Sequence, residues 1–336
     1  MSQYVLARVV RMDNIDIGLF DYDRNNTLYF FLLNGDEEIY MRYGGRDATG
    51  PDAYLNLASL EIALERGLEL HRKKQAGEWK PPARPSPDFA KNYPLLVERT
   101  IARNQCVECH LIGDFQNQHR ELDGTLDKLK HLYRSPDIKT IGIQLDVPKG
   151  LAIKEAKGAA AAAGMKPGDR IAAVDGTPVW TFADLQHRYD QVERKAERVR
   201  FTVDRDGKPV DLDIALAPRW WLSDIRYKQL TIDPRPYFES RPLDAAAKAK
   251  LGLDPAGFAS EVRHVDMFAQ VMKSNELKVG DIVTAVDGTV KDEMADTPEL
   301  YIKLRRKAGD SVTVDVIRDG KRMRMPVKTF RMSFRK

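Results

Sequence analysis

Residues 164–179, GMKPGDRIAAVDGTPV, recur at residues 276–291 as ELKVGDIVTAVDGTVK. A second pair of segments follows each copy, FTVDRDGKPVDLDI at residues 201–214 and VDVIRDGKRMRMPV at residues 314–327. Self-similar segments in the same order, at nearly constant spacing, indicate two copies of one structural module. The second half of the chain is therefore predicted to hold two modules of the same fold.

Each copy is predicted to be built from strands, tight turns and one helix. A Gly-Asp pair leads into an apolar strand in both copies, over residues 170–174 and 282–286, and an Asp-Gly pair makes the tight turn that leaves it. Further along, Asp-Gly pairs at residues 206–207 and 319–320 join alternating strands as hairpins. The helix between strand and hairpin is marked by apolar residues at helical spacing, which are Phe182, Leu185 and Tyr189 in the first copy and Leu300 and Leu304 in the second.

The order Ala-Gly, Lys-x-Gly-Asp, Asp-Gly, helix and Arg-Asp-Gly-Lys hairpin resembles the PDZ domains of bacterial envelope proteins such as the Do-type proteases. The resemblance covers roughly residues 138–217 and 224–330. It implies a small β-barrel capped by two helices, with a groove that captures a peptide C-terminus by strand addition. The serine-nucleophile motif G-x-S-x-G is absent from the sequence, which argues against proteolysis.

The PDZ resemblance also implies where a peptide would bind. In the first copy the carboxylate-binding loop corresponds to Thr140, Ile141, Gly142 and Ile143, where glycine permits a close backbone approach. The facing helix wall is predicted to consist of Phe182, Leu185, Gln186 and Tyr189. In the second copy residues 227–231, YKQLT, hold no glycine, which puts peptide binding there in doubt. The alternative to peptide binding is that both copies act as spacers or dimerisation surfaces.

The only two cysteines are three residues apart and precede a histidine, Cys106-Val107-Glu108-Cys109-His110. This is the attachment signature of a covalent c-type haem. On a helix, Cys106, Cys109 and His110 would point the same way, with the thiols forming thioethers and His110 binding the iron. A redox dithiol or a metal-binding pair is the alternative.

A second axial ligand for this haem would be a histidine, because no methionine lies between Met41 and Met165. His119 and His131 are the local candidates for this iron ligand. His119 would need a helix break at Gly113 to reach across the ring. His71 is a more distant candidate, and an open iron site is the alternative.

The N-terminal part predicts a strand over residues 4–10, a hairpin around Asn34-Gly35 and an amphipathic helix from about residue 53 to residue 74. Strand, hairpin and helix resemble the second half of a thioredoxin-like domain. The strand and the C-x-x-C helix that open such a domain are missing, so the resemblance implies a structural or docking unit.

The fold class expected from these segments is α+β and multidomain. An incomplete thioredoxin-like domain is predicted over residues 1–77. A proline-rich linker and a small α-helical haem segment follow over 78–137, with two helices broken near Gly113 and near residues 122–124. The two PDZ β-barrels with capping helices are predicted over 138–219 and 220–330.

Composition excludes two classes of partner. The chain has 54 basic and 50 acidic residues among 336, so its charge is nearly balanced and it shows no basic stripe for nucleic acid. No apolar run approaches the length of a membrane span. The N-terminus does not read as a signal peptide, whereas haem attachment takes place outside the cytoplasm; a processed or truncated envelope or periplasmic protein is expected.

The leading functional hypothesis from sequence is a monohaem c-type cytochrome with PDZ docking modules, serving electron transfer or redox sensing. The alternatives are a PDZ peptide-binding scaffold with a C-x-x-C thiol or metal site, and a peroxidase-like haem enzyme with an open distal site. The expected partners are peptide C-termini or other proteins, a redox partner protein and a second copy of the chain.

Overall fold

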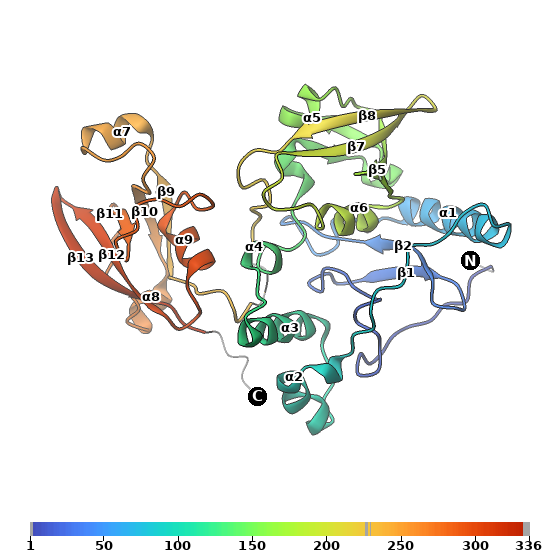
Figure 1. Ribbon diagram of the computed structural model, residues 1–336, viewed down its shortest axis with the longest axis horizontal. Coiled ribbons are helices and arrows are strands. Elements are labelled where there is room, and N and C mark those ends of the chain that lie inside the picture. Colours follow the sequence, from blue (N-terminus) through green and yellow to red (C-terminus); the bar gives the residue numbers. More distant parts are fainter. Residues whose placement is uncertain (1–2, 226–227, 229, 332–336) are drawn as a thin grey trace. The chain divides into compact units, whose positions relative to one another are not determined.

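The computed structural model describes residues 3–225, 228 and 230–331. The chain divides into two compact units, Met1–Gln229 and Leu230–Lys336. Both mix helices with small antiparallel sheets (Figure 1). The described part contains no helix with the length and apolar character that crossing a membrane requires.

The N-terminal part of the first unit is a β-hairpin packed on one long helix. Strands β1 (Tyr29–Leu33) and β2 (Ile39–Gly44) pair antiparallel, and α1 (Leu57–Gln75) follows with Asn56 as its N-cap. The hairpin and helix agree with the sequence prediction. The turn differs, because the Asn34 side chain accepts hydrogen bonds from the backbone of Asp36 and Glu38. The core between hairpin and helix contains Leu32, Tyr40, Met41, Tyr43, Ala63 and Leu70.

The strand predicted for residues 4–10 does not form. Val5 and Val10 expose 97% and 77% of their surface, so this apolar run packs against no sheet. Only Tyr4 is anchored, by a hydrogen bond from its hydroxyl to the carbonyl of Leu64 on α1. β1 and β2 form a sheet of two strands only, which is too small to identify a thioredoxin-like fold. That fold therefore remains a prediction.

The proline-rich stretch and the short helices after it pack against the N-terminal part. Ile17 donates a backbone hydrogen bond to Asp88, and Arg84 forms an ion pair with Asp16. The stretch is thus held along the molecule. The helices that follow are η1 (Ala90–Asn92), α2 (Pro94–Arg99), η2 (Ile101–Arg103), α3 (Cys109–Asp123) and α4 (Lys128–His131).

The first repeat, called module 1 here, covers residues 138–215 and contains a two-stranded and a four-stranded sheet. The order in the larger sheet is β6-β5-β7-β8, and β3 pairs with β4. Its elements are η3 (Ile138–Ile141), β3 (Ile143–Leu145), η4 (Val147–Lys149), β4 (Ile153–Ala156), α5 (Gly158–Ala162), β5 (Arg170–Val174), β6 (Thr177–Pro178), α6 (Phe182–Tyr189), β7 (Arg198–Arg205) and β8 (Lys208–Ala215).

The second repeat, module 2, covers residues 238–328 and forms one five-stranded sheet in the order β13-β12-β11-β10-β9. Its elements are β9 (Phe238–Pro242), α7 (Ala245–Lys250), β10 (Ser260–Val265), α8 (Met267–Val271), β11 (Ile282–Val286), α9 (Pro298–Arg305), β12 (Ser311–Arg318) and β13 (Lys321–Lys328).

The turn chemistry of the repeat is confirmed in both modules. β5 and β11 have the predicted bounds, and each is followed by an Asp-Gly pair with both residues at positive φ. Asp206 and Gly207 adopt φ values of 53° and 79°, and the pair at 319–320 does the same at 50° and 74°. Positive φ at both central residues is the hairpin geometry that right-handed strand twist favours.

Candidate functional site

The loop predicted to bind a carboxylate in module 1 is a short 3-10 turn that ends at Gly142. Asp137 caps the turn by accepting a hydrogen bond from the backbone of Lys139. Gly142 has φ of 88°, and a Cβ there would lie 2.0 Å from the carbonyl oxygen of Lys157. That neighbouring backbone donates a hydrogen bond of 2.8 Å to the Gly142 carbonyl. Glycine is required here by strand pairing inside the module.

Strand β3, which follows Gly142, has β4 on one side only. Ile143 pairs with Ala156, and Leu145 pairs with Ile153. In the described part of the chain no strand lies on the other edge of β3. Ile141 and Ile143 are themselves buried, so the loop contributes to the core of the module. An added strand would have to approach this second edge.

The four predicted wall residues of α6 are all buried, but they face two different neighbours. Leu185 is fully buried, and Tyr189 packs on Trp220 with ring centroids 4.9 Å apart. Phe182 stacks on Tyr54 of the N-terminal part at 3.3 Å. Gln186 donates a hydrogen bond of 2.8 Å to the carbonyl of Arg46. Half of the predicted wall therefore contacts the protein's own N-terminal part.

Strand β2 and the residues after it run beside α6 (Figure 1). The backbone N–H of Arg42 donates to Oδ1 of Asp184 at 2.9 Å, and the hydroxyl of Thr181 donates to the Arg42 carbonyl at 2.5 Å. Nζ of Lys139, in the turn before β3, lies 2.5 Å from Oδ2 of Asp47. α1 lies beside η4, at the far end of β3. We call residues 42–47, RYGGRD, the covering segment; sequence reasoning missed it.

Burial has opposite effects on two ionisable groups of α6. Burial raises the pKa of Asp184 to about 6, against a smaller lowering effect of Arg42. Burial, with a smaller contribution from Arg42, lowers the pKa of His187 to about 4. Both groups are therefore pushed towards their neutral forms, as expected where a helix face is covered by another part of the chain.

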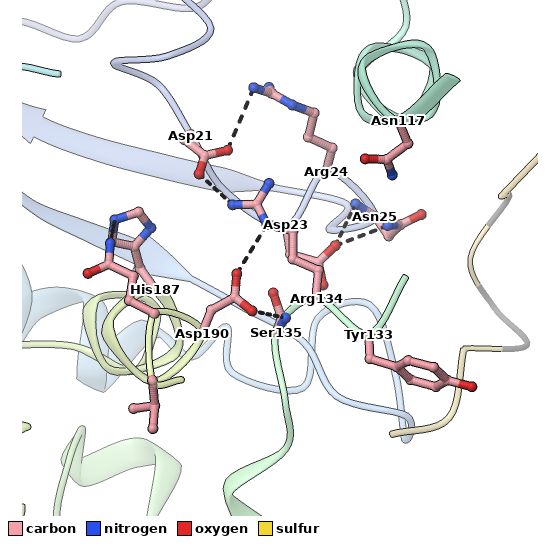
Figure 2. A network of polar contacts seen from close by, with 12 residues as sticks. Asp21, Asp23, Arg24, Asn25, Asn117, Tyr133, Arg134, Ser135, His187 and Asp190 are labelled. Atoms are coloured by element: carbon pink, nitrogen blue, oxygen red, sulfur yellow. Dashed lines mark hydrogen bonds and ion pairs between the residues drawn. The ribbon is translucent and has the colours of Figure 1, made fainter. Parts of the chain in front are cut away.

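A polar network joins module 1 to the N-terminal part (Figure 2). Arg134, just after α4, forms ion pairs with Asp21 and with Asp190 at the C-cap of α6. Although burial alone would raise it, the Arg134 charge lowers the pKa of Asp21 to about 2. Asp190 also accepts hydrogen bonds of 2.7 Å from the backbone of Ser135 and from Arg194. No motif in the sequence marked this network.

The C-x-x-C-H motif lies across the start of α3 instead of within a helix. Cys109 is the first residue of α3, and Glu108 is its N-cap, so Cys106 stands outside the helix and is exposed. The prediction that Cys106, Cys109 and His110 share one helix face is wrong for Cys106. Burial raises the pKa of Tyr22, and a hydrogen bond with the Cys109 thiol raises it further. Nε2 of His110 lies 3.2 Å from a Glu108 carboxylate oxygen.

The two histidines predicted as further iron ligands have other contacts. α3 continues without a break through Gly113, contrary to the prediction, and ends before Gly124 as expected. His119 therefore remains on the helix of His110, packed edge-on against Tyr93 at 5.6 Å. Nδ1 of His131 accepts a hydrogen bond from the backbone of Asp127. Within the described residues, no three His, Cys, Asp or Glu side chains gather as a metal site.

In module 2 the strand equivalent to β3 is β9. Tyr237, immediately before it, has φ of 58° and takes the place of Gly142. The segment predicted for this role, residues 227–231, precedes β9, and its residues 227 and 229 lie outside the described part. Ser240 donates hydrogen bonds from its backbone and hydroxyl to Glu299 on α9, at 2.8 and 2.6 Å. Pro242 has no N–H to offer.

Comparison with known proteins gives one family match, to the PDZ domain, over residues 140–216. Two curated relatives, from Brucella suis and Brucella melitensis, carry the name "Putative zinc metalloprotease" and are 49% identical over 53 residues. This stretch is 16% of the chain and only 14% of each relative's length.

Similar solved structures include the HtrA-type protease AlgW with a decapeptide, at 15% identity and a TM-score of 0.25. That match covers 43% of this chain and 53% of the protease chain. The PDZ domain of EpsC from Vibrio cholerae matches at 19% identity and a TM-score of 0.19, over 29% of this chain and 96% of the domain.

These findings correct the leading functional hypothesis. The proteins and the family that match are proteases and PDZ domains, so the prediction of a c-type cytochrome for electron transfer or redox sensing is wrong. Haem attachment through Cys106, Cys109 and His110 stays an untested prediction, as does the position in the bacterial envelope. The module at residues 140–216 is a PDZ domain.

Proposed function

We propose that this protein is a PDZ-type interaction scaffold in which module 1 binds the C-terminus of a partner peptide between β3 and α6. The PDZ match over residues 140–216 supports the proposal, because such domains capture peptides by strand addition. The observation that carries it is the second edge of β3, beside which no strand lies in the described part of the chain.

The pairing of β3 indicates which backbone groups a peptide would use. Lys157 donates to the Gly142 carbonyl, immediately before the first pair of the ladder, which is Ile143 with Ala156. Across a trans peptide bond the N–H of Ile143 points opposite to the Gly142 carbonyl, and in a strand the Ile143 C=O points the same way as its N–H, so both face the other edge. A peptide that adds there would lie along α6, near the ammonium group of Lys139.

Module 2 is proposed to support the scaffold and not to capture peptides. On its outer strand, the N–H of Ser240 is already bonded to Glu299, and Pro242 has none. Strand addition needs a row of donors and acceptors on the edge, and these two positions offer no free donor. The module therefore fits the spacer or dimerisation role that the sequence left open.

Proteolysis, which the names of the curated relatives raise, is not proposed for this chain. Metalloproteases of the H-E-x-x-H type need a glutamate directly after the first zinc-binding histidine. None of the six histidines of this sequence is followed by glutamate. The two cysteines are proposed to remain a thiol pair on the scaffold, at the start of α3.

The test is a binding screen with the full chain on immobilised peptides that have random last four residues, each presented as free acid and as amide. We expect a subset of free acids to bind at least about tenfold more tightly than their amides, since a carboxylate meets donors that an amide cannot satisfy. Lys139→Glu should weaken this binding, whereas Lys154→Glu on the neighbouring strand β4 is the matched control. Equal binding of acids and amides would contradict the proposal.

A further inference from the structure

We propose that the covering segment, residues 42–47, occupies the groove of module 1 as an internal ligand, and that the partner peptide competes with it. This inference rests on the peptide-binding function proposed above. The segment contacts both walls that a bound peptide would contact, which are α6 and the turn before β3. Its residues 43–47 are all buried.

The contact with α6 requires a residue without a side chain. Gly45 has φ of 116°, and a Cβ there would lie 2.5 Å from the ring of Phe182. Any larger residue would have to move Phe182, whose other neighbour, Tyr54, is stacked on it at 3.3 Å. The next residue is held by its backbone, because the Arg46 carbonyl accepts the hydrogen bond from Gln186. At positions 45 and 46 the segment therefore binds α6 through its shape and its backbone carbonyl, and not through the chemistry of its side chains.

The contact with the turn before β3 is a carboxylate. Asp47 leaves only 3% of its side chain exposed and pairs with Lys139, which is 40% exposed. Its other oxygen accepts the backbone N–H of Thr49. A peptide C-terminus would present the same charged group beside the same ammonium. We infer that the terminal carboxylate of the partner replaces that of Asp47.

The internal ligand indicates the chemistry of the partner. A competing peptide needs glycine where it passes Phe182, and a free carboxylate close behind it for Lys139. Large residues at the first position would meet the clash that excludes them from position 45. The partner is therefore a protein whose C-terminal segment has a glycine about two residues before its free terminal carboxylate. While the covering segment is bound, the apparent affinity for this partner is reduced.

The experiment uses the full chain and a fluorescein-labelled peptide, RYGGRD, with a free C-terminal carboxylate, followed by fluorescence anisotropy. Gly45→Leu should expel the covering segment and raise the affinity for the peptide at least tenfold over the unchanged protein. Gly35→Leu is the matched control, because a Cβ at Gly35 meets nothing within 4 Å. It should bind the peptide no better than the unchanged protein.

A second variant keeps the test decisive if Gly45→Leu does not fold. Asp47→Asn preserves the acceptor for Thr49 and removes the charge that faces Lys139, and should raise the affinity several-fold. Circular dichroism establishes that each variant is folded. Folded variants that bind no more tightly than the Gly35→Leu control would overturn the inference.

The two proposals fail in different ways. Free acids that bind the unchanged protein as tightly as the Gly45→Leu variant would leave peptide capture standing and remove the internal ligand. Absence of any binding to folded Gly45→Leu, in both this titration and the random-peptide screen, would overturn both proposals together.

Discussion

Asp184 on α6 accepts a hydrogen bond of 2.9 Å from the backbone of Arg42, a residue 142 positions earlier in the chain. This contact is one of several that join module 1 to the hairpin and the covering segment. Burial raises the pKa of the Asp184 carboxyl to about 6, from an ordinary value of 3.8. The folded protein therefore holds a proton on this group at pH values where the unfolded chain has released it.

The first prediction concerns the sign of this pH effect. Because the folded-state pKa of Asp184 is raised, its contribution to stability falls as pH rises from about 4 to about 6. Above pH 6 the buried charge costs about 2 to 3 kcal/mol, at roughly 1.4 kcal/mol per pKa unit. Asp184→Asn keeps an oxygen for Arg42 without the charge, so it should be more stable than the unchanged protein at pH 7 and equal to it below pH 4.

Urea unfolding at pH 4, 5.5 and 7 measures this difference. Asp211→Asn is the matched control, since Asp211 is exposed on β8 and no buried charge is removed there. A loss of stability in Asp184→Asn that grows from pH 4 to pH 7 would show that the charged form holds the contact.

The second prediction concerns the Arg134 network. Removing this guanidinium by Arg134→Leu leaves Asp21 and Asp190 without their shared cation. We expect a loss of about 1 to 3 kcal/mol in the free energy of unfolding, because these half-buried carboxylates lose their closest shared donor and, among the described residues, keep only Arg24 and Arg194 as ion-pair partners. Arg200→Leu removes an exposed ion pair with Asp213 and should cost less than about 1 kcal/mol. Chemical denaturation of both variants at pH 7 makes the comparison, and equal losses would contradict it.

The same network predicts sensitivity to acid. The pKa of Asp21 is lowered to about 2, so its contribution is complete above about pH 4 and is lost as pH falls towards 2. In Arg134→Leu this part of the acid transition should disappear, because the charge that lowers the pKa of Asp21 is gone. Acid unfolding curves of the two proteins, followed by circular dichroism, test this.

Local sequence signals predicted the modules well. The Asp-Gly pairs at residues 175–176 and 287–288 require positive φ, which few other residues tolerate, so turn and strand could be placed from the letters alone. The repeat then fixed the order of the elements. Predictions that depended on long-range packing were less successful. The local sequence does not specify which distant segment will pack against a given helix or strand face.

Two errors show the difference between local and long-range signals. Residues 4–10, YVLARVV, form an apolar, β-branched run that is typical of a strand, yet no strand pairs with them and Val5 is exposed. In the motif at residues 106–110, Cys106 was placed on a helix that starts only at Cys109. The covering segment was missed because two adjacent glycines, Gly44 and Gly45, are typical of an ordinary loop. Only the structure shows that Gly45 packs against the ring of Phe182.

The third prediction concerns the outer strand of module 2. Glu299 accepts two hydrogen bonds from Ser240, and burial raises the pKa of its carboxyl. Glu299→Ala removes the acceptor of two hydrogen bonds from the half-buried Ser240, which should destabilise the second unit by about 1 to 3 kcal/mol. Glu299→Gln keeps one acceptor and should cost less. Because the pKa is raised, the glutamine variant should compare best with the unchanged protein at pH well above 4.5.

Hydrogen exchange of the Ser240 amide measures the effect directly. Protection should fall in Glu299→Ala and persist in Glu299→Gln, with Glu261→Ala on β10 as a control for the loss of a surface carboxylate. Unchanged protection in Glu299→Ala would show that another group satisfies this amide.

The fourth prediction concerns the two thiols. Cys106 is exposed and lies before the helix, whereas Cys109 is partly buried and hydrogen-bonded to Tyr22. Alkylation by iodoacetamide requires access to the thiolate, so Cys106 should react first and Cys109 more slowly. Tyr22→Phe removes the hydroxyl that can donate a hydrogen bond to the Cys109 thiolate, so it should slow labelling of Cys109 while leaving Cys106 unchanged. Mass spectrometry of timed digests gives both rates.

Protein prepared from a periplasm that matures c-type haem should still take two labels per chain. A chain that takes none and shows a haemochrome α-band would instead carry the thioether-linked haem that the C-x-x-C-H motif predicts, and the thiol pair would have to be abandoned.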